Sequence, residues 1–529
     1  MDAANDVNKK TVLNTFGFSD KDKILLQRGM VCTFLLGLFA HGFALFNLSI
    51  SHDAVFDFYD SVAAHQHQIG LGRVLEPLYR ELTGSGLLMP WSVGLAALFW
   101  TGLAVVLVCK MFYFSDWIEV ALTAGIMTAN ISVTAVAASY MPWLAVDMFA
   151  LFLAVTGAYC WQMYADSHGL KYLLTGMFAV TVSLSLYQCY LAVSVVLVIL
   201  LSAQNIVKNA GTSKVFWDGV SGVGMLAAGG GIYYVLMQVV CRLAGTPLAE
   251  GYYDSVTNLW DNHENVRQRM VSCIKEGMKH FLSKDENIYP YPIIWAVNIL
   301  LFGVCVCLAV RLLRQRNAEF ERGGVKSERL LLMFLAVVLP FAAYMMRLLN
   351  TSVHDLMVYA VWLLYLLPLL LWKWTSREGA ADRKTHGLIA VLLSFIVFSY
   401  IQTDNAVYVK KEVESKATLS LMTEIMAEVE RTKGYVPGET EVIFVGQVSE
   451  LLQDMPGSQR LSGISGCNKP SAITYDGTYP AYFENVMLRD VKVVFDEGTE
   501  EKTEVLEMPS YPEQGYVKMV DGMVVVKLR

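Results

Sequence analysis

Long apolar runs recur along the chain, separated by short polar stretches. A hydropathy window of about 19 residues predicts roughly eleven membrane-spanning helices. They lie near residues 25–48, 87–112, 117–139, 141–163, 170–187, 189–205, 216–242, 292–313, 328–347, 354–374 and 386–402. Boundaries are hardest to place around Pro142 and around LYQCY, where two spans follow each other closely. The pattern predicts a polytopic α-helical membrane protein.

The pattern changes after about residue 403. The stretch ATLSLMTEIMAEVERTKG has helical periodicity and ends at Gly434, while EVIFVG and VKVVF are typical of short strands. Asp521-Gly522 stands between two alternating runs and predicts a hairpin turn. We therefore expect a transmembrane module over 1–402 and a C-terminal α/β domain over 403–529.

Composition agrees with a membrane protein. The chain has 55% hydrophobic and 17% charged residues, and its mean hydropathy is +0.43. It shows no sustained basic stripe or nucleic-acid-binding motif, so we expect no nucleic-acid partner. The nine cysteines lie mostly in apolar runs without CxxC spacing, which favours packing over a disulfide or metal framework.

Lysine and arginine set the expected orientation, because short cytoplasmic loops carry the positive excess. With the lysine-rich N-terminus inside, the loops 206–215, 314–327 and 375–385 are cytoplasmic, and all three are basic. The loops 49–86, 140, 243–291 and 348–353 then face outward. An odd number of spans places the C-terminal domain outside as well.

The first outer loop, 49–86, gathers carboxylates beside the first span. On a helix, Asp53, Asp57 and Asp60 in SHDAVFDFYDS are spaced i, i+4 and i+7 and share one face. A carboxylate close to hydrocarbon is costly unless it is paired or functional. The alternative is a solvated acidic loop, and spacing alone leaves both interpretations open.

The same loop continues with HQHQIGLGRVLEPLYRELTG. Arg73 and Arg80 are seven residues apart, and Glu76 is placed to pair with Arg80 at i+4. The pair His65-x-His67 resembles a metal-binding pair, but a lone HxH is weak evidence and we assign no metal there.

Two further groups lie at expected outer ends of spans. Tyr187 and Gln188 in SLYQCY are substrate-binding candidates, although tyrosines at a membrane boundary are more often anchors. Arg347, His354 and Asp355 in MRLLNTSVHDL form a candidate anion site, because a guanidinium binds two phosphate oxygens at once. The alternative for Arg347 is a snorkelling arginine.

Taken in order, LFNLSISHDAVFDFYDS, GLGRVLEPLYRELTG, SLSLYQCYLA, RLLNTSVHDLMVYAVWLLYLLP and MPSYPEQGYVKMVDGMVVVKL resemble the bacterial type II membrane glucosyltransferases that modify O-antigen. The resemblance covers nearly the whole chain. It implies a GT-C-like fold, a catalytic aspartate in the first outer loop and a polyprenyl-phosphate-linked sugar donor. Relatives often have Asp-Asp where this chain has His52-Asp53, which leaves Asp53 and Asp57 as alternative bases.

The resemblance implies transfer of a hexose, glucose above all, to a surface glycan such as O-antigen at the outer face of the bacterial inner membrane. Direct displacement needs a carboxylate base and cationic help for the departing phosphate, for which Arg73 and Arg347 are candidates. His52 and Arg80 are further substrate-binding candidates. No cofactor is required, and a divalent cation is compatible with the chemistry. The rivals are a lipid-linked oligosaccharide flippase or polymerase and a non-enzymatic assembly protein.

Overall fold

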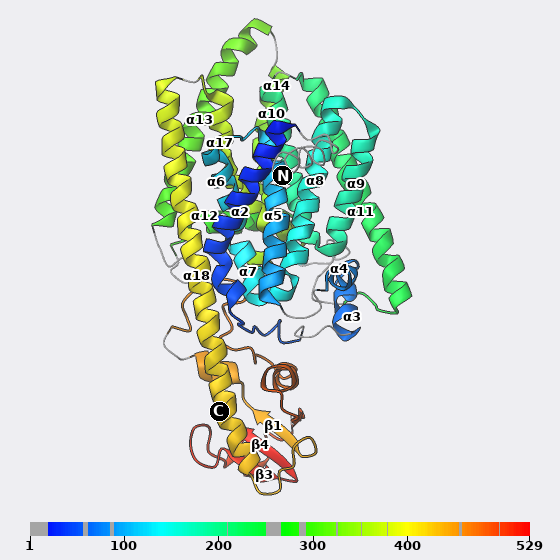
Figure 1. Cartoon of the computed structure of the whole chain (residues 1–529), viewed down its shortest axis with the longest axis vertical. Helices are drawn as coiled ribbons and strands as arrows, with labels where there is room; N and C mark the ends of the chain where they lie inside the picture. The colour runs from blue at the N-terminus through cyan, green and yellow to red at the C-terminus, as the bar shows by residue number, and fades with distance from the viewer. Residues whose placement is uncertain are drawn as a thin grey trace, which may run out of the picture.

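The computed structural model describes residues 19–529, apart from 57–61, 85–88, 209, 250–265, 285–292, 324–325, 351, 378, 454–456 and 497. Figure 1 shows a helical bundle with a small mixed domain at one end. We call this end of the bundle the domain end and the opposite one the far end. Helix α2 (Asp20–Phe46) begins toward the far end and finishes near the C-terminal domain.

The bundle continues through a series of helices. These are α5 (Pro90–Phe112), α6 (Trp117–Thr128), α7 (Ile131–Ser139), α8 (Leu144–Ser167), α9 (Leu170–Leu186), α10 (Leu191–Val207), α11 (Thr212–Ala244), α13 (Ile294–Gly323), α14 (Lys326–Ala343) and α18 (Ala380–Arg431). Further helices lie between them, namely α3 (Val62–Gly70), α4 (Glu76–Thr83), α12 (Val266–Leu282), α15 (Met346–Leu349), α16 (Tyr359–Trp362) and α17 (Leu367–Thr375).

Within the described residues, seven helices are long and apolar enough to cross a membrane, or eight if the bent pair α6 and α7 is one span. Every predicted span coincides with a helix or a run of short helices. The chain is therefore a membrane protein, and the number of eleven spans stays a prediction. The predicted span 117–139 is bent by 42° between α6 and α7. Asn130 causes the restart, because its side-chain oxygen accepts a hydrogen bond from the Val133 N–H at 3.2 Å.

Burial separates central from peripheral helices. In its most apolar window, α10 is 83% buried inside the protein, whereas α11 is only 17% buried. Large aliphatic side chains on α11, such as Val223, Val235 and Leu243, are exposed. An exposed apolar face of this length needs lipid around it. Helix α10 therefore forms part of the core, and α11 lies at the lipid boundary.

Helix α18 connects the bundle to the C-terminal domain without a break. It has 52 residues, so it is about 78 Å long at 1.5 Å per residue. Its first half packs on α2, α6 and α13, and near its end Met422, Ile425 and Val429 join the core of the C-terminal domain. The expected domain boundary at 403 lies inside this helix, since the polar stretch after 403 keeps residues with good helix propensity.

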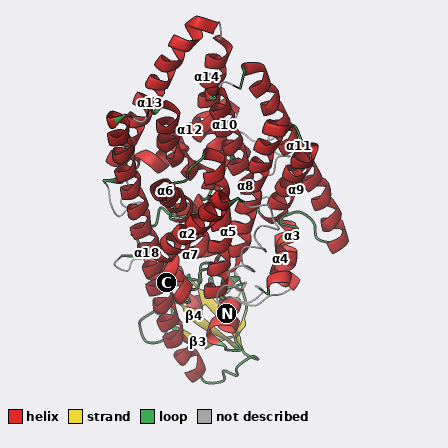
Figure 2. Ribbon diagram, turned by 45° about the horizontal axis from the view of Figure 1, so that its top comes forward, coloured by secondary structure: helices red, strands yellow, loops and turns green. Residues whose placement is uncertain are grey.

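The C-terminal domain holds a four-stranded sheet in the order β2-β1-β4-β3, seen beneath the bundle in Figure 2. Strand β1 (Glu441–Val445) pairs in parallel with β2 (Lys492–Val493) and β4 (Met523–Lys527), and β3 (Val517–Val520) pairs antiparallel with β4. Asp521 and Gly522 both have positive φ, of 51° and 84°, as a type I′ hairpin turn requires. The predicted hairpin is confirmed.

Candidate active site

The start of the first loop is fixed between the bundle and the C-terminal domain. The Ser51 hydroxyl donates to the carbonyl of Ser139, the last residue of α7. From the other side, the Asn485 amide donates to the Val55 carbonyl at 2.9 Å, and Val55 lies in the core of the C-terminal domain. The segment 51–56 therefore forms part of the contact between the two halves of the protein.

His52 and Asp53 stand together in this segment. His52 Nε2 lies 3.2 Å from Asp53 Oδ2, with side-chain exposures of 17% and 27%. The carboxylate is thus held by a neighbour and still reachable from solvent. A group that takes a proton from an incoming hydroxyl needs both properties.

The local backbone differs from the expectation. Residues 52–56 form turns, and helix α3 begins only at Val62. Of the two interpretations left open by the spacing, a helix through Asp53 is therefore excluded for residues 52–56. Hydrogen bonds from Val55 N to the Ser51 carbonyl and from Ala54 N to the Ser51 hydroxyl tighten the chain here. Asp57 and Asp60 lie outside the described residues.

Two lysines from distant parts of the sequence lie within electrostatic range of His52. Burial lowers the pKa of His52, Asp53 opposes this shift, and the charges of Lys411 and Lys469 add to it. Lys411 belongs to α18, and Lys469 belongs to the C-terminal domain. His52 is therefore favoured in its neutral form, in which it can donate one hydrogen bond to the Asp53 carboxylate.

Arg73 forms a second cluster with Tyr187, a predicted site residue, and with Gln68. Its guanidinium carbon lies 4.7 Å from the centre of the Tyr187 ring, and Nη1 donates to the Gln68 side chain at 3.2 Å. Burial lowers the pKa of His67, Arg73 adds to the shift, and Asp53 opposes it. His67 is thus within electrostatic range of both Arg73 and Asp53, so the two clusters are neighbours.

Gln188 fixes the turn that carries Arg73. Its amide donates to the Leu71 carbonyl at 3.0 Å and to the Tyr233 hydroxyl at 2.9 Å, and the Tyr233 hydroxyl donates to the Gly72 carbonyl at 3.1 Å. Gly72 has φ of +78°, and a Cβ there would meet the Tyr233 hydroxyl at 2.8 Å. The turn therefore requires glycine, and Gln188 acts on Arg73 through the backbone.

Arg80 lies away from solvent. Its Nε is 3.7 Å from Glu76 Oε1, and the two side chains are 0% and 1% exposed. The pairing expected from the i, i+4 spacing is confirmed. Because both partners are buried, the pair forms part of the packing around α4. A contact between Arg80 and substrate stays a prediction.

The third group, around Arg347, has partners of its own. Arg347 Nε donates to Glu276 Oε1 at 3.2 Å. Asp355 binds the C-terminal domain twice, since its N–H donates to the Ser465 hydroxyl at 2.9 Å and its Oδ2 accepts from the Ser465 N–H at 2.7 Å. His354 precedes it as the N-terminal cap of a short 3-10 helix. Arg73 and Arg347 therefore have different partners in the described structure.

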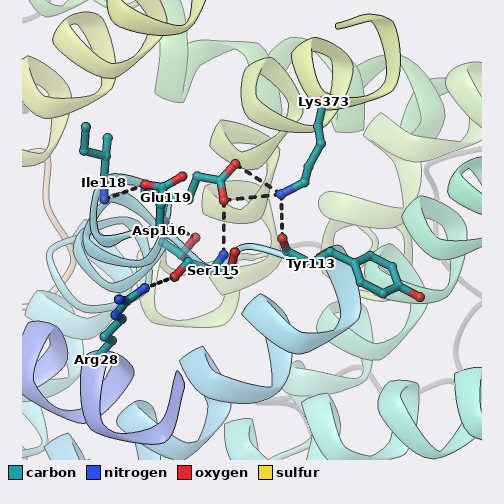
Figure 3. Close-up of polar contacts among 8 residues, drawn as sticks. Arg28, Tyr113, Ser115, Asp116, Ile118, Glu119 and Lys373 are labelled. Atoms are coloured by element: carbon teal, nitrogen blue, oxygen red, sulfur yellow. Dashed lines mark hydrogen bonds and ion pairs between the residues drawn. The ribbon is translucent and has the colours of Figure 1, made fainter. Parts of the chain in front are cut away.

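One set of side chains in the described residues has ligand atoms close enough for a metal ion, and it lies at the far end. Asp116, Glu119 and His386 place one ligand atom each within 4.8 Å of one another. However, the Glu119 carboxylate already has a cationic partner. Lys373 Nζ donates to its two oxygens at 3.2 Å and 3.3 Å, and Figure 3 shows these contacts. Asp116 also caps α6 by accepting from the Ile118 N–H at 2.8 Å. These contacts serve the connection between α6 and α17.

Fold and site together define a helical membrane protein with a carboxylate, a histidine and several cations where a C-terminal domain meets the bundle. A family model described as "Glucosyl transferase GtrII" matches residues 42–369. The match covers more than half of the chain, which therefore belongs to the GtrII glucosyl transferase family and is a glycosyltransferase. No curated protein and no solved structure matches the chain.

Sequence analysis missed the lysines around His52. Lys411 is 2% exposed, pairs with Glu414 at 3.3 Å and donates to the Lys469 carbonyl at 3.1 Å. Asp147, a buried acid on α8, lies within electrostatic range of Arg73. The signal for Lys411 was the pair Lys410-Lys411 beyond the last span, on a side where lysine is less expected.

The lowered pKa of His52 predicts a pH-dependent stability. The unfolded chain protonates this histidine below its usual pKa of about 6.5, while the folded protein resists protonation. The unfolded state then binds more protons, so the free energy of unfolding falls as pH drops through this range. We expect His52→Asn to weaken this dependence, measured as unfolding in detergent across pH.

His168→Asn is the matched control for this measurement. His168 is exposed and has φ of +53°, a conformation that asparagine tolerates. An equal pH dependence in His52→Asn and His168→Asn would contradict the role of burial at His52.

Proposed function

We propose that this protein transfers glucose from a polyprenyl-phosphate-linked donor to a surface glycan such as O-antigen. One observation carries the proposal. In a chain of the GtrII family, Asp53 stays partly exposed beside His52 where the C-terminal domain meets the domain end of the bundle. A reacting hydroxyl that arrives along the domain would meet a carboxylate there.

The basic loops support an outward orientation of the domain end, at the outer face of the inner membrane. The loop 206–215 and the connections 314–327 and 375–385 are rich in lysine and arginine, and the positive-inside rule assigns them to the cytoplasm. Nucleotide sugars are cytoplasmic, so a sugar used outside has to arrive on a lipid carrier. A polyprenyl phosphate is a carrier of this kind.

The chemistry proposed for the site is a single displacement. The Asp53 carboxylate, or that of Asp57, takes the proton of the acceptor hydroxyl as its oxygen bonds to the anomeric carbon. The bond from that carbon to the phosphate oxygen breaks, and the polyprenyl phosphate leaves with the electron pair. Neutral His52 orients the carboxylate. Arg73 stabilises the charge that develops on the phosphate, and no cofactor takes part.

The C-terminal domain provides a surface for the acceptor. Tyr475 of this domain stacks on Phe56 of the first loop, with ring centres 6.1 Å apart, and their side chains are 48% and 39% exposed. Exposed aromatic faces suit the apolar faces of sugar rings. The acceptor glycan would lie across this pair with its hydroxyl toward Asp53.

A transfer assay tests the proposal. The purified chain in liposomes should move glucose from polyprenyl phosphate to an O-antigen polysaccharide, with the product identified by mass spectrometry. Surface glycans from a strain that lacks the gene should lose the same hexose. If liposomes move the lipid-linked sugar across the membrane without forming a glycosidic bond, the flippase alternative replaces the proposal.

A further inference from the structure

A short segment of the C-terminal domain, residues 461–469, is inserted into the domain end of the bundle. Its side chains Leu461, Ile464 and Cys467 belong to the buried apolar core of the bundle, whereas Ile473, a few residues further on, belongs to the core of the C-terminal domain. This inserted segment is therefore packed as part of the bundle, although the chain that follows it belongs to the domain.

Polar contacts fix the inserted segment on two sides. Ser465 exchanges two hydrogen bonds with Asp355, of 2.9 Å and 2.7 Å, at the start of a short 3-10 helix of the bundle. On the other side, Lys411 of α18 donates to the Lys469 carbonyl at 3.1 Å. The inserted segment therefore has a defined position relative to the bundle.

Gly466 lies where the inserted segment meets the end of α7. It has φ of +84°, and a Cβ placed on it would overlap Ser139 Oγ and lie 3.1 Å from Ser139 Cβ. Turning the serine hydroxyl away would leave the second of these contacts, and the left-handed backbone itself favours glycine. The close approach of the inserted segment to Ser139 therefore requires glycine at position 466.

Ser139 contacts the turn that carries Asp53. Its carbonyl accepts a hydrogen bond from the Ser51 hydroxyl, and Ser51 Oγ accepts in turn from the Ala54 N–H at 3.1 Å. Ser51 thus closes a turn that has Asp53 inside it. An unbroken series of contacts runs from Gly466 through Ser139 and Ser51 to this turn, and such contiguous packing and hydrogen bonding can couple distant residues.

We propose that Gly466 is a positioning residue for Asp53. By letting the inserted segment lie against Ser139, it sets the place of the turn closed by Ser51, and hence of the carboxylate. Gly466 lies outside residues 42–369, which the family model matches, so membership of the family does not assign it this role. The proposal rests on the proposed function only in the task given to Asp53, whereas the series of contacts stands without it.

Hydrogen–deuterium exchange of the full-length chain in nanodiscs tests the contacts without a transfer reaction. We expect Gly466→Ala to speed exchange of the amides in the turn 51–55 about tenfold or more, because a displaced Ser139 no longer holds the turn against local opening. Gly457→Ala is the matched control. Gly457 has φ of +90°, and no heavy atom in the described part of the chain lies within 4 Å of a Cβ placed on it. This variant has similar backbone strain without the overlap, and exchange in the turn should change about twofold at most.

Transfer kinetics test what the position of the turn does for Asp53. We expect Gly466→Ala to lower kcat about a hundredfold, the effect of misplacing a reacting group by about 1 Å, and to change KM for the donor about twofold at most. Adding Ser139→Ala removes the hydroxyl that the new methyl group would overlap. This double variant should recover part of kcat and of the slow exchange, and it provides the same comparison if Gly466→Ala alone fails to fold.

Three outcomes would overturn the proposal. The first is unchanged exchange of the turn 51–55 in Gly466→Ala. The second is an equal effect of Gly466→Ala and Gly457→Ala, which would assign the change to backbone strain alone. The third is a normal kcat in a Gly466→Ala chain whose turn exchanges faster, which would separate the turn from the reaction. If the unsubstituted chain transfers no glucose, faster exchange in Gly466→Ala supports the series of contacts and counts only against the proposed function.

Discussion

Replacing Asp53 by asparagine should reduce glucose transfer by about two to four orders of magnitude, the usual contribution of a general base. Asparagine has nearly the same size and cannot take a proton. The side chain is 27% exposed, so the substitution should leave the fold intact. Turnover measured with the polyprenyl-phosphate-linked donor, together with the unfolding temperature in detergent, separates lost chemistry from lost structure.

Asp57→Asn belongs in the same experiment, because the choice between the two bases is open. Loss of transfer in Asp57→Asn with normal turnover in Asp53→Asn would assign the role to Asp57. Asp521→Asn is the control, since it removes an exposed carboxylate and leaves an Asn-Gly hairpin turn, which type I′ geometry accepts. Near-normal turnover in both single variants and in their double variant would exclude an aspartate base in this loop.

Glu76→Gln should destabilise the protein by about 3–5 kcal/mol, because it removes the charge of one member of a buried ion pair. Both side chains are at most 1% exposed, so water cannot take the place of the removed charge. Glu81→Gln removes an exposed carboxylate from the same helix and should change stability by less than about 0.5 kcal/mol. The measurement is the free energy of unfolding in mixed micelles.

The double variant Glu76→Gln, Arg80→Met sharpens this test. It removes both charges and should recover a large part of the stability, since an apolar replacement of a buried ion pair is often tolerated. Equal stability of Glu76→Gln and Glu81→Gln would show that the pair contributes little. Transfer activity in the folded double variant would further show that Arg80 is not needed for substrate.

The sequence predicted what depends on local pattern. Apolar runs located the helices, and Asp521-Gly522 located the hairpin, because hydropathy and turn chemistry are properties of neighbouring residues. The break at Asn130 was missed since a single cap inside an apolar run hardly changes the average hydropathy. The unbroken course of α18 through residue 403 was missed because a change from apolar to polar residues also marks many domain boundaries.

The candidate site was predictable only in part, for a related reason. The first loop showed its acids and Arg73 directly. The effect of Lys469 on His52 and the hydrogen bonds between Asp355 and Ser465 join residues that are far apart in the sequence. No local pattern encodes such contacts, because they arise only when the C-terminal domain packs on the bundle.

The continuous helix α18 makes the C-terminal domain a rigid extension of the membrane part. The domain is connected to the bundle through α18. Asn485 and Ser465 on its surface also bind Val55 and Asp355, so the domain has little freedom to move relative to the bundle. Its distance from the lipid surface is then a fixed length, set by the number of helical residues. The length of this one helix would then set the height above the membrane at which a glycan is modified.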